Sequence, residues 1–174
     1  MEARRDVDEM SLHLRRVLEY AGSSAFEAER RKAREEFFGH RDPEFSNDEI
    51  LLDRCAAYYN WFMFDRRDSR SHKTPVRLYV AEHPDLPARI RTNLLACEDS
   101  VFSTFKVVEV EADHVILLNL LGEESDYYRV VARPDDLLHQ GQMITARLVR
   151  WDGAHHFHGQ VEEWPQSPRD VFGW

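Results

Sequence analysis

Cysteine is nearly absent from this sequence. Cys55 and Cys97 are the only two thiols among 174 residues. Two thiols exclude a disulfide framework and a four-cysteine zinc site. Cys55 falls on the apolar stripe of an expected helix and Cys97 falls at an expected helix end. Neither position has the electropositive surroundings that would activate a thiol, so we predict no catalytic cysteine.

Long hydrophobic runs are also missing. No apolar segment approaches the roughly 18–20 residues that a membrane-spanning helix needs. The first six residues, MEARRD, carry charge and have no apolar stretch of the kind found in a secretory signal. We therefore expect a soluble, cytoplasmic protein with no membrane partner.

Basic residues are in the minority. Lys and Arg number 23 against 32 Asp and Glu, which gives a net charge of −9. Such a chain is a poor general binder of polyanions, because affinity for nucleic acids comes largely from neutralising phosphates with Lys and Arg. Residues 1–99 hold 17 basic and 20 acidic residues, which leaves room for a local basic face. Residues 100–174 hold only 6 basic and 12 acidic residues.

Recognisable catalytic motifs are lacking as well. The chain has no Gly-x-Ser-x-Gly elbow, no glycine-rich phosphate loop and no His-Glu-x-x-His pair. Its adjacent glutamates do not form a glycosidase pair, because neighbouring side chains on a helix or strand diverge. We therefore assign no catalytic residue and no cofactor.

Helical periodicity runs through residues 1–99, where apolar residues recur at spacings of three and four. The first helical stretch covers residues 1–38. A capping box beginning at Ser46 predicts a second helix, and Thr74, which precedes a proline, predicts a third. A fourth helix is expected at about residues 86–97.

Strand-like periodicity replaces the helical one at Ser100. About five short strands joined by tight turns predict a small antiparallel curled sheet or partly open barrel. The predicted fold class is therefore α+β. Its expected parts are a helical region at 1–99, a β-domain at 100–164 and a C-terminal tail at 165–174.

Several packing and turn motifs resemble a known group of proteins. They are YNWFMFD at 59–65, KTP at 73–75, STFKVVEV at 103–110 and GQMITARL at 141–148. Together they resemble the body region of uncharacterised bacterial proteins that often carry a SEC-C motif, a zinc knuckle like the tail of the SecA translocase. The knuckle itself needs closely spaced cysteines, which this chain lacks. The resemblance therefore implies a fold and no zinc-binding role.

One short run, HHFH at 155–158, has the spacing of metal ligands. In a strand His156 and His158 point to the same face, and two imidazoles on one face can begin a zinc or nickel site. A third ligand would come from Asp152, His114 or Glu162. The simpler interpretation is a hairpin arm with polar residues on its solvent side.

A basic loop at 65–73 is the other candidate site, because its cations lie close to aromatic residues. Such a combination can contact RNA or phosphate. The simpler interpretation is a solvated loop whose aspartates offset part of its charge. The candidate binding residues are Trp61, Arg66, Arg67, Arg70 and Lys73.

Three functional classes remain open. We favour a non-enzymatic protein-binding or adaptor module with an unidentified protein partner, because no catalytic pattern is present. The alternatives are a nucleic-acid- or ribosome-associated factor that uses the basic loop, and a metal-dependent enzyme that uses His156 and His158. Residues 1–38 also carry a modest apolar stripe, which permits self-association.

Overall fold

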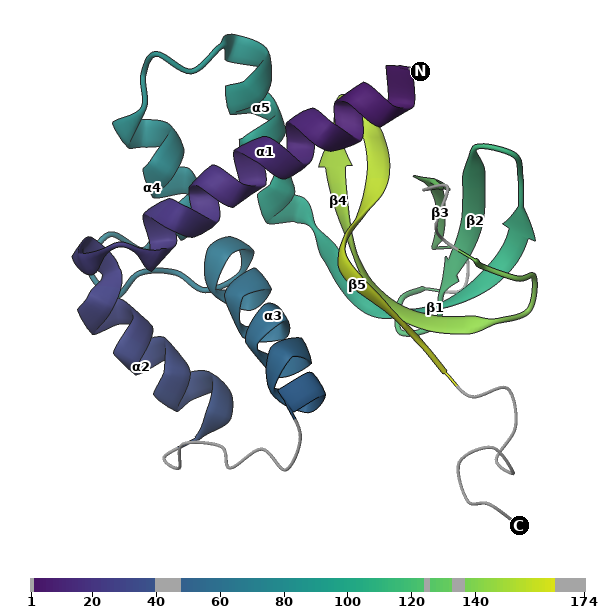
Figure 1. The fold of residues 1–174 in the computed structure, drawn as a ribbon, viewed down its shortest axis with the longest axis horizontal. Coiled ribbons are helices and arrows are strands. Elements are labelled where there is room, and N and C mark those ends of the chain that lie inside the picture. Colours follow the sequence, from purple (N-terminus) through teal and green to yellow (C-terminus); the bar gives the residue numbers. More distant parts are fainter. Residues whose placement is uncertain (1, 40–47, 124–125, 133–136, 165–174) are drawn as a thin grey trace. The chain divides into compact units, whose positions relative to one another are not determined.

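A computed structural model of the chain contains helices in its first part and strands in its second (Figure 1). The expected α+β class is therefore confirmed. The chain divides into two compact units, Met1–Glu98 and Asp99–Trp174. The structure describes residues 2–39, 48–123, 126–132 and 137–164.

The helices precede all of the strands. No helix among the described residues is long and apolar enough to cross a membrane. The helices are α1 (Glu2–Gly22), η1 (Ser24–Phe26), α2 (Glu27–Phe38), α3 (Asp48–Phe64), α4 (Pro75–Glu82), α5 (Ala88–Ala96) and η2 (Cys97–Asp99), where η marks a 3-10 helix.

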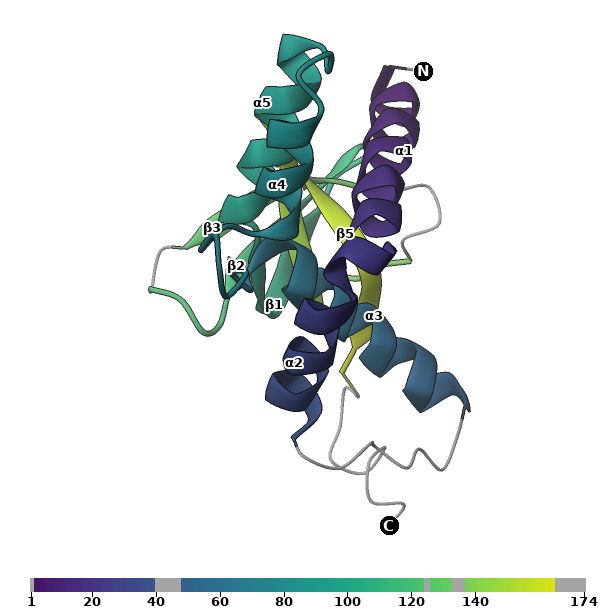
Figure 2. The same cartoon turned by 90° about the vertical axis from the view of Figure 1, so that its left-hand side faces the viewer.

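The helix α1 buries one stripe of its surface, as its sequence spacing requires. Met10, Leu14, Val17 and Ala21 are buried at intervals of three and four residues. The helix α4 packs against both α1 and α5 (Figure 2). The apolar stripe of α1 therefore belongs to the core of the helical unit.

The start of α4 has the cap that the sequence predicts. Thr74 Oγ1 accepts a hydrogen bond from the Arg77 amide at 3.3 Å, and Pro75 occupies the first turn. The Thr74 hydroxyl also donates to Glu98 Oε1 at 2.5 Å. This bond joins the start of α4 to the 3-10 turn after α5. The expected cap at Ser46 lies outside the described residues.

The five strands close into a barrel in the order β1-β2-β3-β5-β4, and β4 pairs again with β1. All pairs are antiparallel except β3 with β5, which is parallel. This is the strand order of an OB-type barrel. The strands are β1 (Val101–Val110), β2 (His114–Asn119), β3 (Tyr127–Val131), β4 (Met143–Trp151) and β5 (Ala154–Glu163).

Each strand contributes a buried apolar side chain to the barrel interior: Phe105, Leu117, Val130, Ile144 and Phe157. The alternation of side chains along each strand sends the intervening residues to the outer face. A register shift between Val107 and Glu109 marks a bulge in β1. Bulges bend a strand and increase its twist, which helps β1 to pair with both β2 and β4.

A polar network fixes the turn between β2 and β3. Asn119 Oδ1 accepts hydrogen bonds from Ser103 Oγ at 2.5 Å and from the Leu121 amide at 3.1 Å. Asn119 Nδ2 donates to Asp126 Oδ2 at 2.9 Å. The Tyr128 hydroxyl donates to the same Asp126 oxygen at 3.2 Å. Side chains from β1, β2 and β3 therefore meet at one end of the barrel.

Gly122 is expected to be required in this turn. A Cβ atom at Gly122 would lie 2.5 Å from Asp126 Oδ2 and 2.7 Å from Asn119 Nδ2, two atoms that are hydrogen bonded to each other. We expect Gly122→Ala to lower the free energy of unfolding of the barrel by about 1–3 kcal/mol. Urea titration followed through the amide NMR signals of β2 and β3 measures this loss.

Gly22→Ala is the matched control, because no atom lies within 4 Å of its added Cβ. We expect that substitution to change stability by less than about 0.5 kcal/mol. Equal effects of the two substitutions would show that the close approach at Gly122 does not constrain the turn.

Candidate functional site

The basic loop at 65–73 is anchored by a buried ion pair. The side chain of Arg66 is only 6% exposed. Its guanidinium donates to both carboxylate oxygens of Glu36, at 2.7 and 2.9 Å, and to Glu29 Oε2 at 3.1 Å. Arg66 therefore ties the end of α3 to α2, and its charge is neutralised within the protein.

Glu29 receives further hydrogen bonds from its surroundings. Ser69 donates to it through its hydroxyl at 2.5 Å and through its amide at 3.2 Å, and Lys32 Nζ donates at 3.2 Å. Burial alone would raise the pKa of Glu29, but the hydrogen bonds from Ser69, Arg66 and Lys32 outweigh burial and lower the pKa to about 2. Glu29 is thus a permanent buried anion at the centre of this network.

The other candidate binding residues differ in their accessibility. Arg67, Arg70 and Lys73 are exposed. Trp61 is half-buried, with its ring centroid 5.3 Å from that of Phe37. The structure therefore leaves three of the four predicted cations available to a ligand and gives Arg66 a structural role.

The Glu29 network predicts a specific acid sensitivity. Because the folded-state pKa of Glu29 lies below its ordinary value of 4.5, its stabilising effect is complete above about pH 5 and is lost as the pH falls toward 2. We expect Glu29→Gln to be less stable at neutral pH. Between pH 5 and pH 2, the wild type should lose on the order of 3 kcal/mol more of its free energy of unfolding than Glu29→Gln loses.

Urea unfolding followed by far-ultraviolet circular dichroism at several pH values measures this difference. Glu35→Gln is the control, because Glu35 is an exposed neighbour on the same helix. The interpretation fails if Glu29→Gln and Glu35→Gln lose stability in parallel as the solution is acidified.

The candidate metal ligands His156 and His158 lie on β5, opposite Val149 and Arg147 of β4. His156 is buried and His158 is half-buried. Among the described residues, neither histidine belongs to a group of three potential ligands. The structure therefore does not bring a third ligand to them from Asp152, His114 or Glu162.

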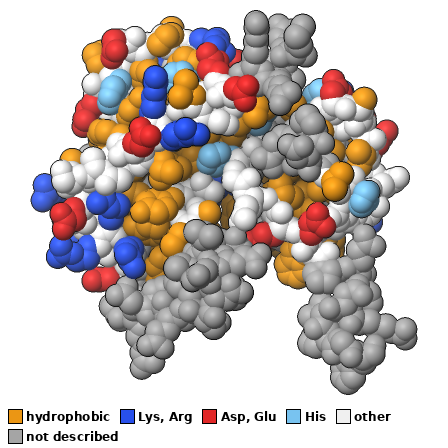
Figure 3. Space-filling view, in the orientation of Figure 1, with side chains coloured by type: hydrophobic (Ala, Val, Ile, Leu, Met, Phe, Trp, Pro, Cys, Tyr) orange, Lys and Arg blue, Asp and Glu red, His pale blue; other side chains and the backbone are white. Residues whose placement is uncertain are grey.

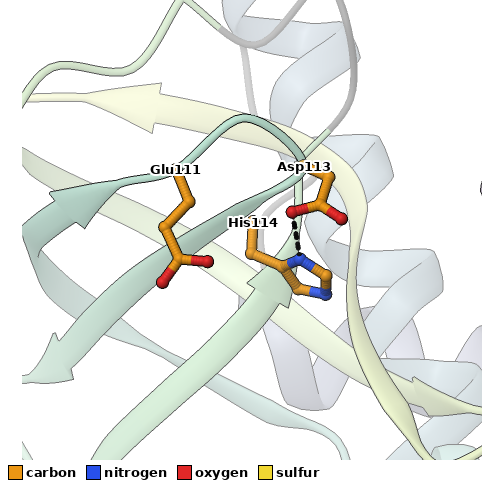
Figure 4. A group of neighbouring side chains, drawn as sticks. All are labelled: Glu111, Asp113 and His114. Carbon is orange, nitrogen blue, oxygen red and sulfur yellow. Dashed lines mark hydrogen bonds and ion pairs between the residues drawn. The ribbon is translucent and has the colours of Figure 1, made fainter.

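A different group of potential ligands lies at the turn between β1 and β2 (Figure 4). Ligand atoms of Glu111, Asp113 and His114 all lie within 4.8 Å of one another. His114 Nδ1 is 2.8 Å from Asp113 Oδ1, and this hydrogen bond lowers the pKa of Asp113. Arg129 Nη2 donates to Glu111 at 2.8 Å. A metal cation would therefore have to compete with the Arg129 guanidinium for this carboxylate.

The cysteines are placed as expected for inert thiols. Cys97 is fully buried, and its Sγ donates to the Asn93 carbonyl at 3.3 Å. Burial raises the pKa of the Cys97 thiol to about 12. Cys55 on α3 is half-buried.

The outer face of the barrel carries a row of cross-strand neighbours that the sequence did not single out. Leu118 of β2 is opposite Tyr127 of β3 and Lys106 of β1. Lys106 is opposite Met143 of β4, whose carbonyl accepts the Trp164 amide at 2.9 Å. We call these five residues, Tyr127, Leu118, Lys106, Met143 and Trp164, the outer row.

Large apolar side chains of the outer row are accessible. The exposed fractions are 55% for Tyr127, 39% for Met143 and 49% for Trp164. The indole Nε1 of Trp164 donates to Thr145 Oγ1 at 2.8 Å, which holds its ring beside β4. The aromatic side chains are therefore presented from a hydrogen-bonded sheet rather than from a flexible loop.

Further apolar side chains extend the outer row along β1 and β2. Leu120 is 42% exposed, and its amide donates to the Thr104 carbonyl at 2.9 Å. Phe102 is 57% exposed and lies under the guanidinium of Arg147, which is 5.5 Å from the ring centroid. Leu120 comes two residues after Leu118, and Phe102 comes four residues before Lys106. Because side chains alternate along an extended chain, each points to the same outer face as its partner in the outer row.

Exposed acidic residues adjoin the outer row in the sequence. Glu162 and Glu163 end β5 directly before Trp164, and Glu123 lies in the turn after Leu121. Figure 3 shows orange and red side chains together on the described surface of the strands, with little blue. The outer row thus combines exposed apolar side chains with one cation, Lys106, and has exposed carboxylates next to it in the sequence.

Sequence reasoning missed this face because the partners in the row come from four different strands and from Trp164, which directly follows the fifth strand. Alternation along a single strand could identify Met143 or Tyr127 as outward-pointing. It could not show that they lie in one row, since that depends on the registers between strands.

Comparison with family models, with curated proteins and with solved structures gives no match. The resemblance to proteins with a SEC-C motif therefore stays a prediction. The functional argument rests on the chain's own geometry.

Proposed function

We propose that this protein is a non-enzymatic protein-binding module whose barrel docks a partner through the outer row. The observation that carries the proposal is the exposure of Tyr127, Met143 and Trp164 in one cross-strand row, with Leu120 beside it. Single exposed apolar residues are ordinary on a protein surface, but adjoining ones are typical of interaction sites.

The residue types support a protein partner. Tyr, Trp and Met are enriched in protein–protein interfaces, and Tyr and Trp often dominate their binding energy. The Trp164 ring is already held by its hydrogen bond to Thr145, so it loses little conformational entropy when a partner binds.

The charges indicate the chemistry of that partner. Exposed acidic residues adjoin the apolar ones in the sequence, Glu123 after Leu121 and the pair Glu162 and Glu163 before Trp164. They favour a partner with an apolar anchor flanked by Lys or Arg, because complementary charges speed association and select the right partner.

A nucleic-acid partner is less favoured by the same observations. OB-type barrels often bind oligonucleotides on the outer face of strands 2 and 3. Here Arg129 on β3 is paired with Glu111, and Asp113 lies beside them. This arrangement offers little positive charge for phosphates to neutralise.

The test is capture of a partner from nuclease-treated cell lysate with the tagged chain. We expect the double variant Leu120→Lys, Met143→Lys to capture at least about tenfold less protein than the wild type, because it places positive charge where the partner needs apolar contact. Leu12→Lys is the matched control, since Leu12 is exposed to a similar degree on α1.

Circular dichroism should show that all variants fold. The proposal is contradicted if the double variant captures as much protein as the wild type. Material captured from untreated lysate and absent after nuclease treatment of the same lysate would instead favour the nucleic-acid alternative.

A further inference from the structure

The strand β5 has one edge that is only partly paired. It pairs with β4 along most of its length, down to the pair of Glu163 with Ile144. Its pairing with β3 consists of two residue pairs, Val130 with His155 and Val131 with His156. Within the described ranges, no other strand pairs with β5 on that side. The C-terminal half of β5 therefore pairs with β4 alone among the described strands.

The backbone of this half is positioned to accept another strand. A register shift between Thr145 and Arg147 marks a bulge where β5 passes Gly159. The shift places Gly159, Gln160 and Val161 opposite Ala146 alone, and β5 pairs regularly with β4 again at Glu162 and Glu163. Together with Trp164 these residues give an open edge of three residues, which is about 10 Å long.

The direction of the Glu163 amide follows from its neighbour. The Trp164 amide donates to the Met143 carbonyl, so it points toward β4. In an antiparallel pair, successive residues direct their N–H and C=O groups to opposite sides. The N–H and C=O groups of Glu163 therefore point to the open edge.

Pairing of this edge with a second copy of the chain is opposed by charge. Glu162 and Glu163 are both exposed. Two such edges side by side would place the carboxylates of one copy against those of the other, and like charges on adjacent strands destabilise a sheet. The same carboxylates would attract Lys or Arg on a different chain.

Apolar contacts are available on both sides of the edge. Val161 packs partly against the barrel core, and Trp164 lies in the outer row. A strand added here would place alternate side chains beside Val161 and beside Trp164. Each face of the edge thus offers one apolar side chain and one carboxylate, Val161 with Glu163 and Trp164 with Glu162. A segment in the order apolar-basic-basic-apolar therefore fits the edge.

We propose that the partner adds an extended segment, with two adjacent basic residues flanked by apolar ones, to the open edge of β5 at residues 162–164, as a sixth strand. This inference rests on the proposed protein-binding function and specifies its binding mode. Strand addition is an established form of peptide recognition, in which main-chain hydrogen bonds supply affinity and alternate side chains supply specificity.

The test uses a fluorescently labelled peptide, acetyl-SVKKVS-amide, and two versions of it that are N-methylated at positions 2 and 4 or at positions 3 and 5. Only one of these two sets of amides can face β5 in a given register. We expect one methylated version to bind at least about tenfold more weakly than the other, in fluorescence anisotropy at about 0.15 M salt. Equal affinities of the two versions overturn strand addition.

Two protein variants test the same edge from the other side. We expect Glu163→Pro, which removes the outward-pointing N–H, to weaken binding of the unmethylated peptide at least about tenfold. Glu163→Gln keeps that N–H and removes only the charge, so we expect a change of about threefold or less. Equal weakening by both variants would overturn strand addition in favour of simple charge attraction.

The two proposals can fail separately. If capture from lysate depends on Leu120 and Met143 while the two methylated peptides bind equally, the protein-binding function stands and strand addition is wrong. The peptide comparison uses the wild-type chain, so it remains decisive even if Glu163→Pro does not fold.

Discussion

The barrel depends on β1, because this strand pairs along both of its edges. Phe105, for example, faces Asn119 on β2 and Ile144 on β4. The junction of β3 with β5 rests on only two residue pairs. The long ladders on either side of β1 hold the outer row in register, and the short junction leaves the end of β5 without a neighbour. The outer row and the open edge of β5 therefore both follow from the unequal lengths of the strand pairings that close the barrel.

The helical unit depends on a different kind of interaction. Arg66 links two carboxylates that lie 30 and 37 residues away in the sequence. Burying such charges is costly, and removing one partner leaves the others uncompensated. The network is nevertheless well satisfied, because Ser69 and Lys32 supply additional hydrogen bonds to Glu29. A loop rich in charge is thereby held against α2. Its cation Arg66, which could otherwise bind a phosphate, is bound to carboxylates of the same chain.

Local sequence signals predicted the elements better than their assembly. The cap at Thr74, the apolar stripe of α1 and the five strands all follow from patterns within a few residues. Closure of the barrel does not, because β3 and β5 are separated by β4 and no turn links them. The burial of Arg66 was equally hidden, since its partners Glu36 and Glu29 lie 30 and 37 residues away in the sequence. The outer row needed the registers of all five strands, which a single sequence does not display.

Because the two thiols differ in burial, their reactivity can report local unfolding of the wild-type chain. Cys97 is fully buried, and its thiol is a poor nucleophile as long as it stays buried. A pulse of alkylating reagent therefore modifies Cys97 only in molecules whose surroundings have transiently opened. The rate of that reaction reads out the local opening equilibrium around α5, and the half-buried Cys55 gives an internal reference on α3.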